Sequence, residues 1–382
     1  MKRKTLIVAA IALGVLALVV IAIWPAAPLW ARLGANPVCV QGDLLHLRLV
    51  PCQPIEVSAK AATPVPLPTP EGEAPIPLIF DDDGSPDGVI ALLFFLRNPL
   101  YSVEAVTVSP GEAHPALFAQ HVAQLLAAVG RPDIPVGVGR ETPLEGNNAF
   151  PEPWRQASDT FWGIDLPEAA DPVESHAAPQ LIVETLNGSS HPVAIFVSGT
   201  HTNLAEALRL EPGIRGHIRE VLVMGGSAYV EGNIESDWPA IHNRVAEWNI
   251  WVDPIAAREV FSSDLPLHVV PLDGTNRVTW IEADARDWVA AGSAEGTLAA
   301  QLLRWMLRSW APDGVHVWDL VAAVVTTDSR LCPEVALALD VIVTPGIEQG
   351  RTVVEDQSPN AQVCLTPDAP QVKERVTAMF AR

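Results

Sequence analysis

Basic residues are scarce in this chain of 382 residues. It carries 24 Lys and Arg against 45 Asp and Glu, which gives a formal net charge of −21. A nucleic-acid partner requires a basic face, so this balance argues against one. The same balance permits a site that binds a cation.

Cysteine is scarce as well, with four residues, and no two of them have the C-x-x-C spacing of many zinc sites. None follows directly after the N-terminal apolar run, which argues against a lipoprotein anchor. An even number in an exported chain permits two disulfides, although sequence alone allows three pairings. We predict the pairs Cys39–Cys52 and Cys332–Cys364, because they keep each closed loop local.

The N-terminus predicts export. The basic tip MKRK is followed by an apolar run of about twenty residues, enough to span a bilayer. We predict that residues 1–27 form an uncleaved signal anchor, and a cleaved signal peptide is the alternative. In both cases the remaining chain lies outside the cytoplasm, either anchored at the cell surface or secreted.

The rest of the chain divides by composition. Residues 28–76 are predicted to form an extracytoplasmic linker, because the stretch from Cys52 onward is rich in Pro, Ala and Thr. Residues 77–382 are long enough for one large α/β domain. Its apolar runs, Gly-containing turns and helical patterns alternate, which predicts a mostly parallel, Rossmann-like open sheet with flanking helices. The predicted strands are 78–80, 103–109, 133–138, 192–198 and 220–223.

A segment rich in Trp and Pro, residues 141–172, is predicted to be a long loop. It is either an insertion on the surface or a lid over a site. Further along, Glu247 and Asn249 alternate with Trp248 and Ile250, so the two polar side chains are predicted to share one face, as on a strand.

The stretch PLIFDDDGSPDGVIALLFFLRNP, which begins at Pro77, dominates the domain. Residues 78–80 predict a buried parallel strand. Three aspartates, residues 81–83, follow where that strand should end. Residues 84–86 predict a turn, and a helix is expected to begin at Asp87 or Gly88.

Three interpretations of this stretch compete. Ligands of open α/β sheets bind at the carboxyl ends of strands, and clustered carboxylates require protons or a cation. The first interpretation is an acidic surface turn. The second is the D-x-D-G-[ST] motif of haloacid-dehalogenase-type phosphatases, which residues 81–85 fit. The third is the D-x-D-P-G-x-D-D motif of inosine-uridine nucleoside hydrolases, which Asp81, Asp83 and Asp87 match.

Later motifs favour the third interpretation. The segments SGTHTNLAEALRLEP, EVLVMGG, EGN and AEWNIWVDPIAAREVF occur in this order. They resemble the series T-G-G-x-T-N, V-x-M-G-G, G-N and A-E-x-N-x-x-x-D-P-x-A-A of the inosine-uridine preferring nucleoside hydrolase family. The similarity extends from residue 77 to at least residue 333.

The resemblance implies an enzyme that splits ribonucleosides into ribose and free base with a Ca²⁺-bound water. It implies Asp83 as a calcium ligand and general base, Asp319 as a ligand, and Ser198 as a ligand through its backbone carbonyl. Such hard oxygen donors suit Ca²⁺. A small nucleoside is the implied partner, and relatives are commonly oligomers, which makes a homo-oligomer possible.

The resemblance also implies sugar-binding side chains. The residues that match ribose-binding positions are Asp87, Glu112, Asn233, Glu247 and Asn249. Asp81 matches a carboxylate behind the metal ligands. Many relatives place a His directly before the second aspartate ligand, where this chain has Trp318. Stabilisation of the leaving base therefore falls to Trp318, by stacking, or to His316.

Gly88 is the largest departure from the family motif, because relatives have a metal-binding aspartate there. Water could replace the missing ligand, Asp87 could turn onto the metal, or the turn could shift so that Asp82 and Asp87 restore the spacing. We expect a retained but weaker calcium site, which Gly88→Asp would strengthen. The alternative is a nucleoside- or ribose-binding protein that has lost turnover.

Overall fold

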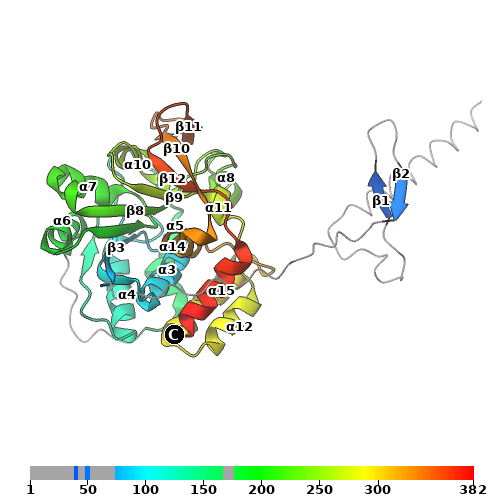
Figure 1. Ribbon diagram of the computed structural model, residues 1–382, viewed down its shortest axis with the longest axis horizontal. Coiled ribbons are helices and arrows are strands. Elements are labelled where there is room, and N and C mark those ends of the chain that lie inside the picture. Colours follow the sequence, from blue (N-terminus) through cyan, green and yellow to red (C-terminus); the bar gives the residue numbers. More distant parts are fainter. Residues whose placement is uncertain (1–37, 42–47, 52–73, 167–175) are drawn as a thin grey trace, which may run out of the picture. The chain divides into compact units, whose positions relative to one another are not determined.

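The structure is a computed structural model that describes residues 38–41, 48–51, 74–166 and 176–382 (Figure 1). The chain divides into two compact units, residues 1–63 and 64–382. In the first unit, β1 (Val38–Gln41) and β2 (Arg48–Pro51) pair antiparallel, with Val38 opposite Pro51. These two strands lie within the range predicted to be linker.

The predicted signal anchor lies outside the described residues and stays a prediction. Within the described ranges, no helix is both long and apolar enough to cross a membrane. The predicted pair Cys39–Cys52 includes a cysteine that also lies outside these ranges.

The second unit is built on a ten-stranded sheet with the order β11-β10-β12-β9-β8-β7-β3-β4-β5-β6. All neighbours from β12 to β6 are parallel, and β10 runs antiparallel to both β11 and β12. The prediction of a mostly parallel α/β sheet is therefore confirmed. The strands are β3 (Ile76–Asp82), β4 (Tyr101–Val108), β5 (Val136–Val138), β6 (His176–Ala177), β7 (Val193–Val197), β8 (Ile218–Met224), β9 (Leu267–Val270), β10 (Glu334–Val341), β11 (Thr352–Glu355) and β12 (Ala361–Cys364).

Helices cover both faces of this sheet. They are α3 (Pro86–Arg97), α4 (Pro115–Ala128), α5 (Glu152–Asp159), α6 (Ala178–Gly188), α7 (Thr202–Leu210), α8 (Ile234–Asp237), α9 (Trp248–Val252), α10 (Pro254–Phe261), α11 (Leu272–Thr275), α12 (Glu282–Ala290), α13 (Ala294–Ser309), α14 (Trp318–Thr327) and α15 (Ala369–Phe380). Short 3₁₀ helices occur at Phe161–Gly163, Pro212–His217 and Ser329–Leu331.

The central strand β3 shows how the two layers form. Successive side chains of a strand point to opposite faces. Leu78 and Phe80 accordingly join the apolar core under α3, α4 and α12–α15, whereas Ile79 joins the core under α6, α7 and α10. Figure 1 shows α6 and α7 at one side of the sheet and α12 and α15 at another.

An aromatic cluster fixes β3 against its neighbours just before the acidic residues begin. The rings of Phe80 and Phe196 stack with centroids 5.2 Å apart, and Phe95 of α3 contacts both rings edge-on, at 5.9 and 5.0 Å. All three side chains are fully buried. This packing sets the position of the chain that follows Phe80.

The structure corrects two local predictions. The predicted loop 141–172 contains the helix α5, and its residues 167–175 lie outside the described ranges. Glu247 and Asn249 do not alternate on a strand. Glu247 caps the start of α9, because its side chain accepts hydrogen bonds from the backbone N–H groups of Asn249 and Ile250.

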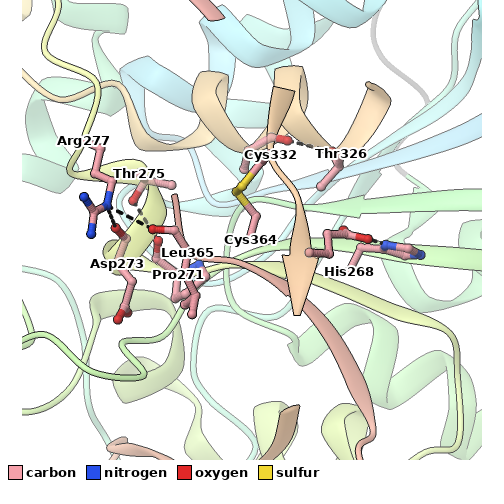
Figure 2. The surroundings of a disulfide bond; sticks show 11 residues. His268, Pro271, Asp273, Thr275, Arg277, Thr326, Cys332, Cys364 and Leu365 are labelled. Atoms are coloured by element: carbon pink, nitrogen blue, oxygen red, sulfur yellow. Dashed lines mark hydrogen bonds and ion pairs between the residues drawn. A yellow bond between two sulfur atoms is a disulfide. The ribbon is translucent and has the colours of Figure 1, made fainter. Parts of the chain in front are cut away.

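The predicted disulfide Cys332–Cys364 is confirmed (Figure 2). It joins the residue after the last 3₁₀ helix to the end of β12, where Cys364 also lies opposite Glu334 of β10. The cross-link therefore closes the antiparallel end of the sheet.

We expect Cys332→Ser/Cys364→Ser to lower the free energy of unfolding by about 3–4 kcal/mol, from the chain entropy of a closed loop of this length. The sequence separation of the two cysteines is 32 residues. Urea unfolding of the oxidised wild type and the double variant measures the difference. A wild type that loses no stability under reducing conditions would contradict this contribution.

Candidate active site

The carboxyl ends of β3, β4 and β7 meet at one edge of the sheet. The backbone carbonyl of Asp82 accepts a hydrogen bond from Ser109 N at 2.7 Å, and that of Asp81 accepts one from Ser198 N at 2.9 Å. Asp83 continues the edge, since its carbonyl accepts from Ala113 N at 2.9 Å. The three aspartates therefore lie between two neighbouring strands, where ligands of open α/β sheets bind.

A cavity of about 500 Å³ opens at this edge. Ten side chains that the sequence predicted for the site line it, from both halves of the domain. They are Asp83, Asp87, Glu112, Ser198, Asn233, Glu247, Asn249, His316, Trp318 and Asp319.

Asp81 lies behind the cavity and is fully buried. Its Oδ1 accepts hydrogen bonds from Thr107 Oγ1 at 2.6 Å and Asn203 Nδ2 at 2.8 Å. Burial raises the pKa of this carboxyl to about 7, although both hydrogen bonds oppose the rise. Asp81 is therefore placed to hold neighbouring elements together, and it does not contact the cavity.

Asp83 lies at the cavity wall with 1% of its surface exposed. Its Oδ1 is buried and has no hydrogen-bond partner among the described residues. Burial, together with repulsion from Asp82 and Asp87, holds the pKa of Asp83 well above its ordinary range. A buried carboxylate oxygen without a partner is costly and indicates a missing proton or ligand.

Asp319, at the start of α14, connects the C-terminal part of the site to the residues that follow β3. Ser85 Oγ donates a hydrogen bond to Asp319 Oδ2 at 3.0 Å, and the backbone N–H of Asp319 donates to Asp87 Oδ2 at 3.2 Å. Burial and the charge of Asp87 hold the pKa of Asp319 well above its ordinary value. Residues more than two hundred positions apart thus form one acidic cluster.

Glu247 and Asn249 are fixed by the backbone around them. Glu247 accepts from Asn249 N at 2.9 Å and from Gly226 N at 3.0 Å, and burial raises the pKa of its carboxyl to about 7. Asn249 Nδ2 donates to the carbonyl of Ser198 at 3.0 Å. Both side chains are therefore held rigidly at the cavity before any ligand arrives.

Glu112 and Asn233 complete the polar side. Burial raises the pKa of Glu112 well above its ordinary value, with further contributions from Asp83 and Asp87. Asn233 presents a buried Oδ1 that has no partner in the described part of the chain. Polar atoms in this condition are suited to binding hydroxyl groups of a ligand.

Aromatic side chains form much of the rest of the cavity wall, and most of them were not predicted from sequence. Phe150 stacks on Trp248 with centroids 4.7 Å apart, and Trp154 packs against Trp248 at 5.4 Å. Trp238 and Trp310 also line the cavity. Phe150 and Trp154 belong to the segment 141–172, which was predicted to be either a surface insertion or a lid. Both side chains line the cavity, so this part of the segment covers the site.

His316 and Trp318 lie together at the cavity, with ring centroids 5.8 Å apart. Trp318 Nε1 donates to Asn276 Oδ1 at 2.8 Å, and His316 Nδ1 lies 3.2 Å from the carbonyl of Val278. These contacts orient both rings, so each can present a face or an edge to a flat ligand.

The oxygen atoms at this end of the cavity are of the chemical types that bind calcium. Asp83, Asp319, Asp87 and the carbonyl of Ser198 supply hard oxygen atoms, and the unpartnered Oδ1 of Asp83 is available for coordination. Across the described ranges, however, no group of three or more His, Cys, Asp or Glu side chains is arranged so that it could hold a metal ion. Side chains would have to turn toward the ion, or water and backbone oxygens would have to complete its shell.

Comparisons with known proteins agree with this geometry. Residues 78–374 match the family model of the inosine-uridine preferring nucleoside hydrolases. A pyrimidine-specific ribonucleoside hydrolase RihA from Salmonella agona is 33% identical over 312 residues, which cover 77% of this chain and 94% of that protein. The corresponding protein of Klebsiella pneumoniae is 32% identical over 249 residues, which cover 64% of this chain and 77% of that protein.

Solved structures share the fold. The purine-preferring ribonucleoside hydrolase from Gardnerella vaginalis has a TM-score of 0.70 at 22% identity, and the match covers 80% of this chain and 99% of that one. The plant nucleoside hydrolase PpNRh1 has a TM-score of 0.71 at 24% identity with the same coverage. The chain therefore belongs to the family of inosine-uridine preferring nucleoside hydrolases and is a ribonucleoside hydrolase enzyme.

Proposed function

We propose that this cavity cleaves the N-glycosidic bond of ribonucleosides into ribose and free base, with Ca²⁺ as cofactor. One observation carries the proposal, the buried and unpartnered carboxylate oxygen of Asp83 at the wall of the cavity. The cavity has an acidic and amide-rich part and an aromatic part, which suit a sugar and a base respectively.

The sugar would be held by the polar part. Asp87, Glu247 and Asn249 are buried and already oriented by backbone contacts, so they can bind hydroxyl groups at little entropic cost. Glu112 and Asn233 offer further polar atoms at the same cavity. The ribose of a nucleoside has three free hydroxyl groups. These five side chains offer enough donors and acceptors to bind all three.

Asp83 would accept the proton of the attacking water. Ca²⁺, held by Asp83, Asp319 and the Ser198 carbonyl with Asp87 beside them, would orient the water and lower its pKa. Positive charge develops on the sugar as the bond to the base breaks. The carboxylates of Asp83, Asp87 and Glu247 stabilise that charge, because they surround the cavity in a water-poor environment.

The base would lie against the aromatic part. Trp318 can stack on it, and His316 can reach a ring nitrogen or oxygen. Stacking accepts both purines and pyrimidines, and the relatives named above include pyrimidine-specific and purine-preferring enzymes. We therefore propose that the aromatic wall supplies affinity for the base.

Incubation of the full chain with inosine, uridine and adenosine in the presence of Ca²⁺ tests the proposed activity. Free ribose is the readout, and an aryl phosphate serves as the matched substrate for the phosphatase alternative. We expect ribose from at least one nucleoside and no phosphate. Phosphate release without ribose would favour the phosphatase. Tight nucleoside binding without ribose would favour a binding protein.

We further propose that the enzyme acts outside the cytoplasm. The N-terminal basic tip and apolar run support this location, and the disulfide Cys332–Cys364 is consistent with it. Protease added to intact cells should degrade the domain, and protection until the cells are broken would refute the proposed topology.

A further inference from the structure

The space beside Gly88 is occupied by the side chain of another residue. A Cβ atom at position 88 would lie 1.8 Å from Asp82 Oδ1 and 2.7 Å from Asp82 Cγ. The backbone of Gly88 is not in the left-handed region, since it is absent from the positive-φ glycines of the described chain. A side chain at position 88 would therefore have to displace the Asp82 carboxylate, and the backbone conformation of Gly88 does not by itself call for glycine.

Asp82 reaches this space from the end of β3 and is held there. Ser198 Oγ donates to Asp82 Oδ1 at 2.9 Å, and Gly84 N donates to Asp82 Oδ2 at 2.9 Å. The carboxylate lies at the N-terminus of the 12-residue helix α3, where the helix dipole favours negative charge. The backbone N–H of Asp83 also donates to this carboxylate. A carboxylate has about four lone-pair sites, so it can still bind another partner.

Asp82 also lies within the acidic cluster. Its charge acts on Asp83, Asp319 and Glu112, and the charge of Asp87 acts on Asp82. The unpartnered Oδ1 of Asp83 independently indicates a missing ligand at this cluster. A carboxylate pushed among like charges is costly unless a cation is shared.

We propose that Asp82 supplies, from strand β3, the carboxylate that position 88 on helix α3 lacks, and that Asp82 is a ligand of the cation in this enzyme. The inference rests on the proposed calcium dependence and adds the residue that completes the ligand set. Positions 82 and 88 then act as a pair, since any side chain at 88 would displace the Asp82 carboxylate from its present position. The sequence-based expectation that Gly88→Asp alone strengthens the site stays a prediction; the pairing proposed here predicts the opposite, because the new side chain would meet Asp82 Oδ1.

A reciprocal exchange tests this pairing. The full chain is prepared as wild type, Asp82→Ala, Gly88→Asp and Asp82→Ala/Gly88→Asp, and Ca²⁺ binding is measured by calorimetry after chelation and dialysis. We expect Asp82→Ala to weaken Ca²⁺ binding about tenfold or more, since ligand charge sets affinity. Gly88→Asp alone should lower the thermal unfolding midpoint without tightening binding. The double variant should recover most of the wild-type affinity.

Two further variants keep the outcome interpretable. Asp82→Asn preserves the shape of the side chain and removes its charge. It therefore replaces Asp82→Ala in the Ca²⁺-binding measurement if Asp82→Ala does not fold. Asp133→Asn removes an exposed charge before β5 and is the control for net charge. If the wild type binds Ca²⁺ and Asp82→Asn binds it equally well, this inference is overturned while the proposed function stands. If the wild type binds no divalent cation, both are overturned.

Discussion

Asp83→Asn should reduce ribose release about a thousandfold, the size expected when a general base is removed. The amide has the same shape as the carboxyl, but it cannot accept the proton of the attacking water. It is also a weaker ligand for a hard cation. Initial rates with the best nucleoside substrate, measured at saturating Ca²⁺ for wild type and variant, give the ratio.

The same substitution should leave the fold intact. Asp83 is buried among like charges, so removing its charge relieves repulsion and does not break an ion pair. The unfolding midpoint of the apo variant should equal or exceed that of the apo wild type. Asp133→Asn, on the surface, should retain full activity. Wild-type turnover by Asp83→Asn would remove Asp83 from the mechanism.

Chelation should abolish ribose release, and added Ca²⁺ should restore it. Asp83, Asp87 and Asp319 carry raised pKa values because burial disfavours their charged forms. A cation among them offsets that repulsion and keeps them ionised. Activity assayed with excess EDTA, and again after excess Ca²⁺, gives the comparison. Undiminished activity with EDTA, in protein shown by elemental analysis to be free of metal, would contradict calcium dependence.

The pH dependence of stability provides a separate readout. Burial raises the pKa values of Asp82 and Glu247 to about 7, and those of Asp83 and Asp319 well above their ordinary range. The folded protein therefore binds protons at these carboxyls more tightly than the unfolded chain, and the apo protein loses stability as pH rises through these raised values. Ca²⁺ competes with those protons. The Ca²⁺-induced rise in unfolding midpoint should therefore be larger at pH 8 than at pH 6.

Local sequence signals predicted the parts of the site that depend on short-range structure. The apolar run of residues 78–80 predicts a buried parallel strand, and the aspartates that follow it must then lie at the carboxyl end of that strand. Asp83 does lie directly after β3. The motif order likewise predicted that Asp319, from α14, belongs to the same site. The structure brings both to one cavity.

The aromatic wall could not be predicted in the same way. Phe150, Trp238 and Trp310 come from separate segments, and no spacing rule links them. Glu247 and Asn249 face the same cavity, as their alternation predicted, but they do so as the cap and the first turn of a helix and not as residues of a strand. The relation of Asp82 to Gly88 depends on the direction of one side chain, which sequence does not specify.

The most direct test of the account is the stoichiometry of products from the wild-type chain. The enzyme is incubated with one nucleoside and Ca²⁺ in phosphate-free buffer, and free base and ribose are quantified chromatographically over time. The account predicts equal amounts of base and ribose, formed over many turnovers and without phosphate. An intact nucleoside after prolonged incubation with Ca²⁺-loaded, folded protein, across purine and pyrimidine substrates, would contradict it.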